Sequence, residues 1–223
     1  MKVEDVMNLH IDRIDIGLLM SNFHKYIEYS ELNHDWQRRL KIQGLAKEIQ
    51  IEDESTAQYY NQKEDSINED YFINIPNVIR YSGLIMLFIY IEWFVRFCEQ
   101  YSEEKGWGKP PNPKRKKIEK KIDWLRKRNK EAFYHPFDQK ILDIIEIRNC
   151  VVHDAGEINT KNQAEAIKRL DGFSVGRFLY MENYILIHEG VIQKLATDAE
   201  VWMNSLLDYL GIGDKIPKSY VVD

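Results

Sequence analysis

The stretch LIMLFIYIEWFVRF, residues 84–97, decides the fold of this chain. It is almost as apolar as a membrane segment, but it is too short to span a bilayer, and Glu92 and Arg96 interrupt it. A helix of this length that is apolar on every side is a core helix, or a core helix that also forms a dimer interface. The lone carboxylate of Glu92 must be paired there, either with Arg96 or with a group on a neighbouring helix.

Two helices are predicted before this stretch, over residues 4–31 and 34–52, and in the second of them apolar residues recur at helical spacing. Residues 53–68 are polar and acidic, which favours a loop or a weak surface helix. The central helix is predicted to begin near Pro76, which suits a first helical turn, with Asn74 as its cap.

Beyond the stretch, the central helix is predicted to run to about Glu104, before a Gly- and Pro-rich loop at residues 106–113. A basic helix follows over residues 114–130, and another helix begins at Pro136 and ends before Gly156, where a left-handed cap is expected. The remaining elements expected are a short helix over residues 162–170, a small hairpin that pairs residues 178–187 with residues 190–192, and a final helix over residues 195–210.

These elements predict an all-α fold, a helical bundle with an N-terminal helical extension and one small β-hairpin. The chain has 223 residues, of which 44% are hydrophobic, enough for a sizeable core. The layout expected is an extension over residues 1–70, a compact domain over residues 71–212 and a short tail over residues 213–223. The role of the extension cannot be read from its sequence.

Charge is distributed unevenly along the chain. The formal net charge of −5 gives no overall indication of nucleic-acid binding. Residues 114–130, however, hold ten basic and two acidic side chains. Such a run is either an electrostatic footprint for a polyanion or a solvated helix face. In the first case Lys116, Lys117, Lys120 and Lys121 are the candidate RNA-binding residues.

Neither a metal site nor a cofactor is indicated by the motifs. Cys98 and Cys150 are the only cysteines, and both lie in apolar runs, which favours buried free thiols. The chain shows neither the ligand spacings of zinc sites nor the Gly-rich loops that bind nucleotides. No apolar segment follows the first charged residues as in a secretion signal, so a cytoplasmic protein without a membrane partner is expected.

Three residues near the end of the helix that follows Pro136 combine complementary chemistry. Arg148, Asn149 and His153 place a permanent cation, a carboxamide and an imidazole within six residues. Imidazole titrates near neutral pH and can move protons in both directions. Guanidinium is planar and can bind two phosphate oxygens at once through parallel N–H donors. The three residues are therefore candidates for metal-free cleavage of a phosphodiester.

The R-N-x-x-x-H pattern of these residues resembles the motif of the HEPN superfamily, whose members are small α-helical domains. The resemblance covers about residues 73–210, with Arg148, Asn149 and His153 at the Arg, polar and His positions. It implies a ribonuclease that uses the 2′-hydroxyl of RNA and leaves a 2′,3′-cyclic phosphate. It also implies a homodimer with a composite site, and a toxin or antiviral effector restrained by an antitoxin or another regulatory protein. Glu92 is the candidate supporting acid.

Helical geometry makes a single-chain site difficult. Two residues five positions apart on a helix are rotated by about 500° about its axis, which places Arg148 and His153 about 140° apart. Asn149 and His153 are four positions apart and share a face. Two chains that face each other across a twofold axis would ease the problem, and would also supply two imidazoles for two proton-transfer roles. The alternatives are structural. Arg148 would form a surface salt bridge with Asp143 or Glu146. His153 would be a residue of the helix C-terminus that interacts favourably with the helix dipole.

Two other functions stay open at this point. The chain could be a HEPN-like helical dimer that binds RNA, a nucleotide or a protein partner without cutting. It could also be a structural interaction domain in which the N-terminal extension carries the function.

Overall fold

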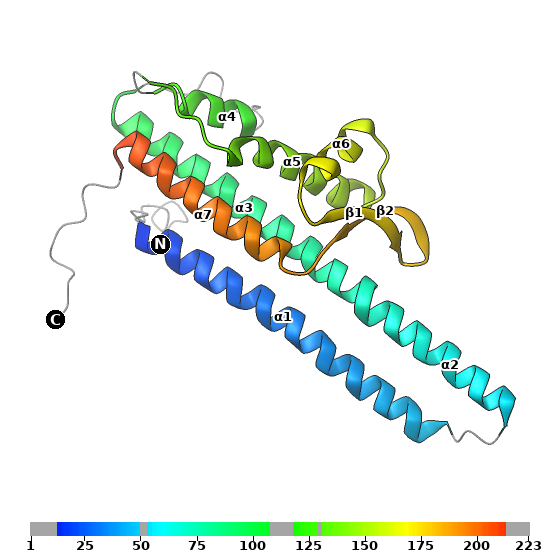
Figure 1. Ribbon diagram of the computed structural model, residues 1–223. Coiled ribbons are helices and arrows are strands. Elements are labelled where there is room, and N and C mark those ends of the chain that lie inside the picture. Colours follow the sequence, from blue (N-terminus) through cyan, green and yellow to red (C-terminus); the bar gives the residue numbers. More distant parts are fainter. Residues whose placement is uncertain (1–12, 50–52, 108–117, 129–130, 213–223) are drawn as a thin grey trace, which may run out of the picture. The chain divides into compact units, whose positions relative to one another are not determined.

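A computed structural model describes residues 13–49, 53–107, 118–128 and 131–212. The fold is mainly α-helical with one small antiparallel two-stranded sheet, as the sequence predicts (Figure 1). In chain order the elements are α1 (Arg13–Glu48), α2 (Glu54–Glu69), the π-helical turn η2 (Asp70–Asn74), α3 (Ile75–Glu104), α4 (Ile118–Leu125), α5 (Phe137–Asp154), α6 (Lys161–Arg169), β1 (Phe173–Phe178), β2 (Met181–Ile187) and α7 (Val191–Leu210).

The two helices predicted before residue 53 are one continuous helix, α1. The predicted break at residues 32 and 33 is wrong because Leu32 and Asn33 carry no helix-breaking constraint, and neither glycine nor proline stands there. The predicted ends of these helices, residues 4–12 and 50–52, lie outside the described residues. The acidic segment that follows forms the helix α2, whose N-terminus Asp53 caps by accepting the backbone N–H of Thr56 at 2.8 Å.

The helix α3 has no separate start, contrary to the prediction. From Glu54 to Glu104 the helix is continuous through η2, and Asn74 lies inside it. Pro76 lacks the N–H that would continue the ladder, and the preceding turn widens so that the N–H of Ile75 reaches the carbonyl of Asp70. The predicted domain boundary at residue 70 therefore falls within continuous helix.

The hairpin exists, but its strands differ from those predicted. β1 pairs with β2 in antiparallel register, Phe173 opposite Ile187. The chain turns at Leu179 and Tyr180, both of which have positive φ, and these residue types give no sequence signal for such a turn. Val191 and Ile192, expected to be a strand, begin α7 instead, because their buried positions continue with helical spacing to Leu195 and Ala199.

The chain divides into two compact units. Unit 1 contains the described parts of Met1–Phe23, Leu87–Leu142 and Leu195–Asp223. In it α3 and α7 lie side by side (Figure 1), with the ring centroids of Phe94 and Trp202 5.8 Å apart. The indole N–H of Trp202, which is fully buried, donates to Asp138 Oδ1 at 3.0 Å, so this core has a specified polar contact at its centre.

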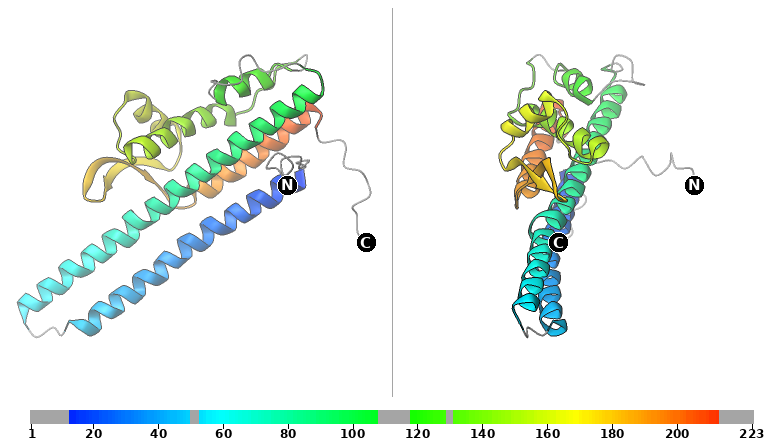
Figure 2. Two further views of the ribbon diagram at one scale, coloured as in Figure 1. Left: turned by 180° about the vertical axis from the view of Figure 1, so that it is seen from behind. Right: turned by 90° about the vertical axis from the view of Figure 1, so that its right-hand side faces the viewer.

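Unit 2 contains His24–Met86 and Asp143–Lys194. Its α1 and α2 form the two arms of a helical hairpin (Figure 2), where Arg38 Nη1 donates to Asn68 Oδ1 at 3.0 Å. The backbone of β2 is bound by side chains of α3. Asn77 donates to the carbonyl of Ile185 at 2.8 Å and accepts the N–H of Ile187 at 2.9 Å. These hydrogen bonds give partners to backbone groups of β2 that would otherwise be unpaired at the edge of the sheet.

The quoted stretch at residues 84–97 is a core segment with one exposed edge. Its buried side chains include Leu84, Leu87, Ile91 and Phe94, whereas Ile89 is 51% and Trp93 39% exposed. The continuous helix Glu54–Glu103 contains an 18-residue window that is long and apolar enough to cross a membrane, by length and composition only, and 44% of that window is buried. Core helices of soluble proteins share these properties.

Candidate functional site

The three motif residues lie on the outer side of α5, spread over an arc of about 140°. The opposite side of the helix is buried through Ile144, Ile147 and Cys150, so the apolar spacing of the sequence fixes the rotation of α5 about its axis. Positions 148, 149, 152 and 153 follow helical spacing along the outer side. Arg148 and Asn149 are half-buried there, and His153 is exposed.

Arg148 and Asn149 are joined by a hydrogen bond. Arg148 Nη1 donates to Asn149 Oδ1 at 3.0 Å. The helix stays regular to Asp154, so it does not loosen to bring Arg148 towards His153. Asn149 instead lies between the two, because it contacts Arg148 directly and shares a helix face with His153, four residues on. The guanidinium and the imidazole thus flank one carboxamide.

The imidazole of His153 is accessible. It lies in the last turn of α5, where a positive charge is favoured by the helix dipole. It forms no hydrogen bond or ion pair with any residue that the structure describes. Both ring nitrogens can therefore contact a ligand, and neither tautomer is selected by a neighbour.

The end of α5 is fixed by a left-handed cap, as the sequence predicts. Ala155 has φ 53° and Gly156 has φ 94°, and the N–H of Gly156 reaches back to the carbonyl of Cys150 at 3.1 Å. The ring of Tyr81 packs against Gly156 so closely that a Cβ there would overlap its hydroxyl. Tyr81 cannot retreat easily, because it is buried and its hydroxyl donates to Ile185 O at 2.6 Å.

Gly156→Ala should therefore destabilise the protein by about 2–4 kcal/mol, which combines the strain of positive φ with overpacking against Tyr81. Gly190→Ala is the matched control, since Gly190 also has positive φ, at 77°, but has open space around it. Urea denaturation followed by circular dichroism measures both. Equal losses of stability in the two variants would contradict the role given to Tyr81.

Cys150, within the motif, is a structural thiol. Its Sγ donates to the carbonyl of Glu157 at 3.0 Å. Burial raises the pKa of this thiol to about 12, with a further contribution from Asp154. The thiolate is therefore not available as a nucleophile near neutral pH. Cys98 is likewise buried with a raised pKa, so both cysteines are the buried free thiols that the sequence predicts.

Asp143, one of the two acids considered as partners of Arg148, binds an arginine of another helix. Two nitrogens of the Arg169 guanidinium on α6 donate to Asp143 Oδ1, Nη2 at 2.6 Å and Nε at 3.1 Å. Asp143 is only 2% exposed. This bidentate pair, in which Asp143 is buried and the Arg169 side chain is 48% exposed, links α5 to α6.

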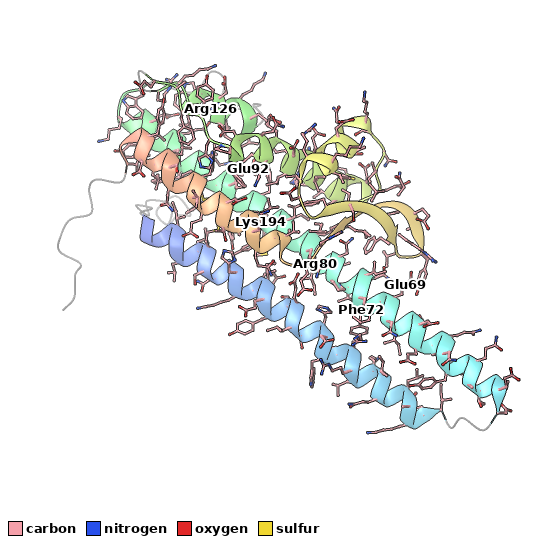
Figure 3. All side chains as sticks on the ribbon, in the orientation of Figure 1. Glu69, Phe72, Arg80, Glu92, Arg126 and Lys194 are labelled. Carbon is pink, nitrogen blue, oxygen red and sulfur yellow. The ribbon has the colours of Figure 1, made fainter. Side chains whose placement is uncertain are left out.

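Glu92 is not the buried acid that the sequence predicts. Its side chain is 40% exposed and lies 3.5 Å from Arg96 Nη2, its partner four residues on (Figure 3). The outward edge of α3 places it in solvent, so it has no need of a partner on another helix. Glu92 belongs to unit 1 and the motif to unit 2, and its supporting role stays a prediction.

The structure describes residues 118–128 of the basic run, and these include two of the four candidate lysines. Lys116 and Lys117 lie outside the described residues, and only Ile118–Leu125 is assigned to α4. Lys120 is exposed. Lys121 Nζ lies 2.7 Å from Glu99 Oε2, and the two side chains are only 17% and 10% exposed. Lys121 is thus committed to an ion pair within unit 1, which corrects its assignment to an RNA-binding surface.

No group of three or more His, Cys, Asp or Glu side chains in the described part of the chain could hold a metal ion. No protein-family model, no curated protein and no solved structure matches the chain. Assignment to a family consequently depends on Arg148, Asn149 and His153 alone.

Proposed function

We propose that this protein is a metal-independent endoribonuclease of the HEPN type. The proposal is carried by one observation, the outer side of α5, where Arg148 contacts Asn149 and an exposed His153 shares the face of Asn149. RNA supplies its own nucleophile in the 2′-hydroxyl. The site needs only to move protons and to stabilise charge on phosphorus.

Each motif residue has a distinct role in this reaction. His153 transfers a proton, either from the 2′-hydroxyl or to the leaving 5′-oxygen. Arg148 binds the non-bridging phosphate oxygens and stabilises the charge that develops on them. Asn149 fixes the position of the guanidinium, because its Oδ1 accepts from Arg148 Nη1. Its Nδ2 stays available to a phosphate oxygen.

The complete site requires two chains. Acid and base are two roles, whereas each chain offers one His153. A homodimer with facing α5 helices brings two imidazoles to one phosphate. An exposed apolar side chain beside the motif supports an interface, namely Val152 on α5, which is 43% exposed.

The resemblance extends the proposal to a biological role. The protein would act on RNA in the cytoplasm as a toxin or antiviral defence effector, without a membrane partner. An antitoxin or another regulatory protein would restrain it. The resemblance of the motif is the only support for this role.

Cleavage is expected to persist in excess EDTA and to leave 2′,3′-cyclic phosphate and 5′-hydroxyl ends. The reason is that imidazole and guanidinium provide both proton transfer and charge stabilisation at the phosphate. End-group analysis of a short labelled RNA measures the products. Products with 3′-hydroxyl ends, or complete inhibition by EDTA, would contradict the mechanism, and a fully active monomer in sedimentation would contradict the composite site.

A second candidate function is a module that binds RNA, a nucleotide or a protein partner without cutting it. The observation that favours it is the exposed imidazole of His153, whose orientation no described neighbour fixes. A catalytic base is normally oriented by a hydrogen bond to its second nitrogen. RNA binding that survives His153→Ala, in a protein that never cleaves, would select this alternative.

A further inference from the structure

A cavity of about 700 Å³ opens in unit 1 between α4 and the start of α5. Its lining is mixed, with apolar side chains from Ile122 and Leu142 beside the polar side chains of Arg126 and His135. The volume lies in the range of small-molecule sites, which is about 300–1,000 Å³. This α4–α5 cavity did not emerge from the sequence, because its walls come from separate elements.

An exposed aromatic ring stands at this cavity. Tyr134 is 79% exposed, and the guanidinium carbon of Arg126 lies 4.9 Å from its ring centroid. Arginine covers one face of the ring and leaves the other open. An open aromatic face backed by a cation is a platform on which a planar aromatic ligand stacks.

The cation beside the ring is held in place by polar contacts. Arg126 Nε donates to the carbonyl of Phe133 at 2.8 Å, and Arg126 Nη2 lies 3.5 Å from Asp138 Oδ2. Asp138 accepts the backbone N–H of His135 at 2.9 Å and the indole N–H of Trp202 at 3.0 Å. Because the guanidinium is ordered before binding, little of its entropy is lost when a ligand stacks on the ring beside it.

His135 offers a directed hydrogen-bond donor to the cavity. Its Nδ1 accepts the N–H of Phe137 at 3.2 Å, and its ring stacks on Phe133 with an interplanar angle of 6°. With Nδ1 occupied as an acceptor, the neutral ring carries its proton on Nε2. No described residue takes that donor. The rim carboxylates of Glu119 and Asp123 provide acceptors.

The guanidinium of Arg126 gives the cavity one contact for a phosphate. Arg126 Nη1 has no partner among the described residues. The other charged side chains of the lining are the acids Glu119, Asp123 and Asp138, which suit the donors of a base rather than a phosphate. An aromatic face, ring-edge donors and acceptors, and one guanidinium nitrogen for a phosphate are together what a nucleotide requires.

We propose that the α4–α5 cavity binds the base of an unpaired nucleotide, which stacks on Tyr134. The inference rests on the proposed function, and it makes single-stranded RNA the substrate class. A base in a duplex is already stacked on both faces and cannot enter the cavity without an unpairing cost. The stacked base would anchor the strand, and the reaction at His153 would be a separate event.

Binding of a fluorescein-labelled single-stranded deoxyoligonucleotide, followed by anisotropy, tests the cavity without cleavage, because the probe lacks the 2′-hydroxyl. Tyr134→Ala should weaken binding about five-fold or more, the lower limit for loss of one base–aromatic stack. Tyr134→Trp should restore it. The matched control is Tyr180→Ala. Tyr180 is 53% exposed and also has an arginine over its ring, but it does not line the cavity.

Each outcome is decisive. Wild-type binding that is lost in Tyr134→Ala, kept in Tyr180→Ala and weak for the matching duplex supports the base site. Equal binding by the two alanine variants, or no binding of the probe by the wild type, overturns it. Failure of the proposed function is distinguishable, since His153→Ala would then cleave RNA like the wild type while Tyr134→Ala still loses the probe.

Discussion

Replacing His153 by alanine should lower RNA cleavage by roughly 10²- to 10⁴-fold, the usual contribution of a positioned proton-transfer group. The fold should be unaffected, because His153 is exposed and contacts no described residue through a hydrogen bond or ion pair. Purified wild type and variant are compared on the same labelled RNA over a range of enzyme concentrations. Far-ultraviolet circular dichroism checks that both proteins are equally helical.

His188→Ala is the matched control for this experiment. His188 is also exposed and belongs to the same unit, but its Nε2 lies 2.9 Å from Ser174 Oγ. It should cleave like the wild type. Equal cleavage by His153→Ala and His188→Ala would show that the activity resides elsewhere or comes from a contaminant, and the proposal would be withdrawn.

Glu31→Ala should destabilise the protein by about 3–5 kcal/mol, the cost of leaving a buried charge without its partner. Glu31 Oε1 accepts from Arg80 Nε at 2.8 Å, and the two side chains are 10% and 11% exposed. Arg80 also donates to the carbonyl of Ile187 at 3.0 Å, so the pair ties α1 and α3 to the strand β2 (Figure 3). Urea denaturation measures the loss.

Asp123→Ala provides the comparison with an exposed ion pair. Asp123 and Lys127 are 2.8 Å apart, but their side chains are 58% and 63% exposed. Removal of such a pair costs less than about 1 kcal/mol. A double variant, Glu31→Leu with Arg80→Met, should recover much of the stability that Glu31→Ala loses, because it removes both charges from the interior. Similar losses for Glu31→Ala and Asp123→Ala would refute the importance of burial at Arg80.

The elements that the sequence predicts correctly are those with local causes. The left-handed end of α5 follows from Gly156, because glycine adopts positive φ without a steric penalty. The helix α6 follows from apolar spacing, and its capping box at Thr160 and Gln163 is a local pattern as well. For such features the residues that decide the structure are neighbours in the chain.

The errors have causes that lie beyond the local sequence. The hairpin turn uses Leu179 and Tyr180 at positive φ, and the N–H of Leu179 is bound by Asn74 Oδ1 at 2.9 Å, from a helix about a hundred residues earlier in the chain. Asn74 is not a cap, because the helix is continuous on both sides of it. Lys121 is predicted to be a surface cation because its partner, Glu99, lies on another helix and is not a neighbour in the sequence.

In the candidate site, too, some features have local causes and others depend on the tertiary structure. Helical periodicity alone places Asn149 and His153 on one face, and the position of α5 in the fold then exposes that face. The contact of Arg148 with Asn149 depends on side-chain rotamers, which the sequence does not specify. The α4–α5 cavity depends on the packing of Tyr134 against Arg126, which required the tertiary structure.

The widened turn at η2 has a consequence for the tolerance of this protein to insertions and deletions. A π-helical turn holds one residue more than the α-helical path requires, and each residue of an α-helix rotates its successors by about 100°. Deletion of one residue between Asp70 and Asn74 would therefore close the wide turn into a regular α-helical turn and leave the rotation of α2 relative to α3 nearly unchanged. Glu69 could then keep its position 3.8 Å from Arg177. The same deletion in a regular turn of α3 would rotate Glu69 by about 100°. Among the turns of this long helix, η2 is thus the one that can lose a residue without turning α2 away from the hairpin.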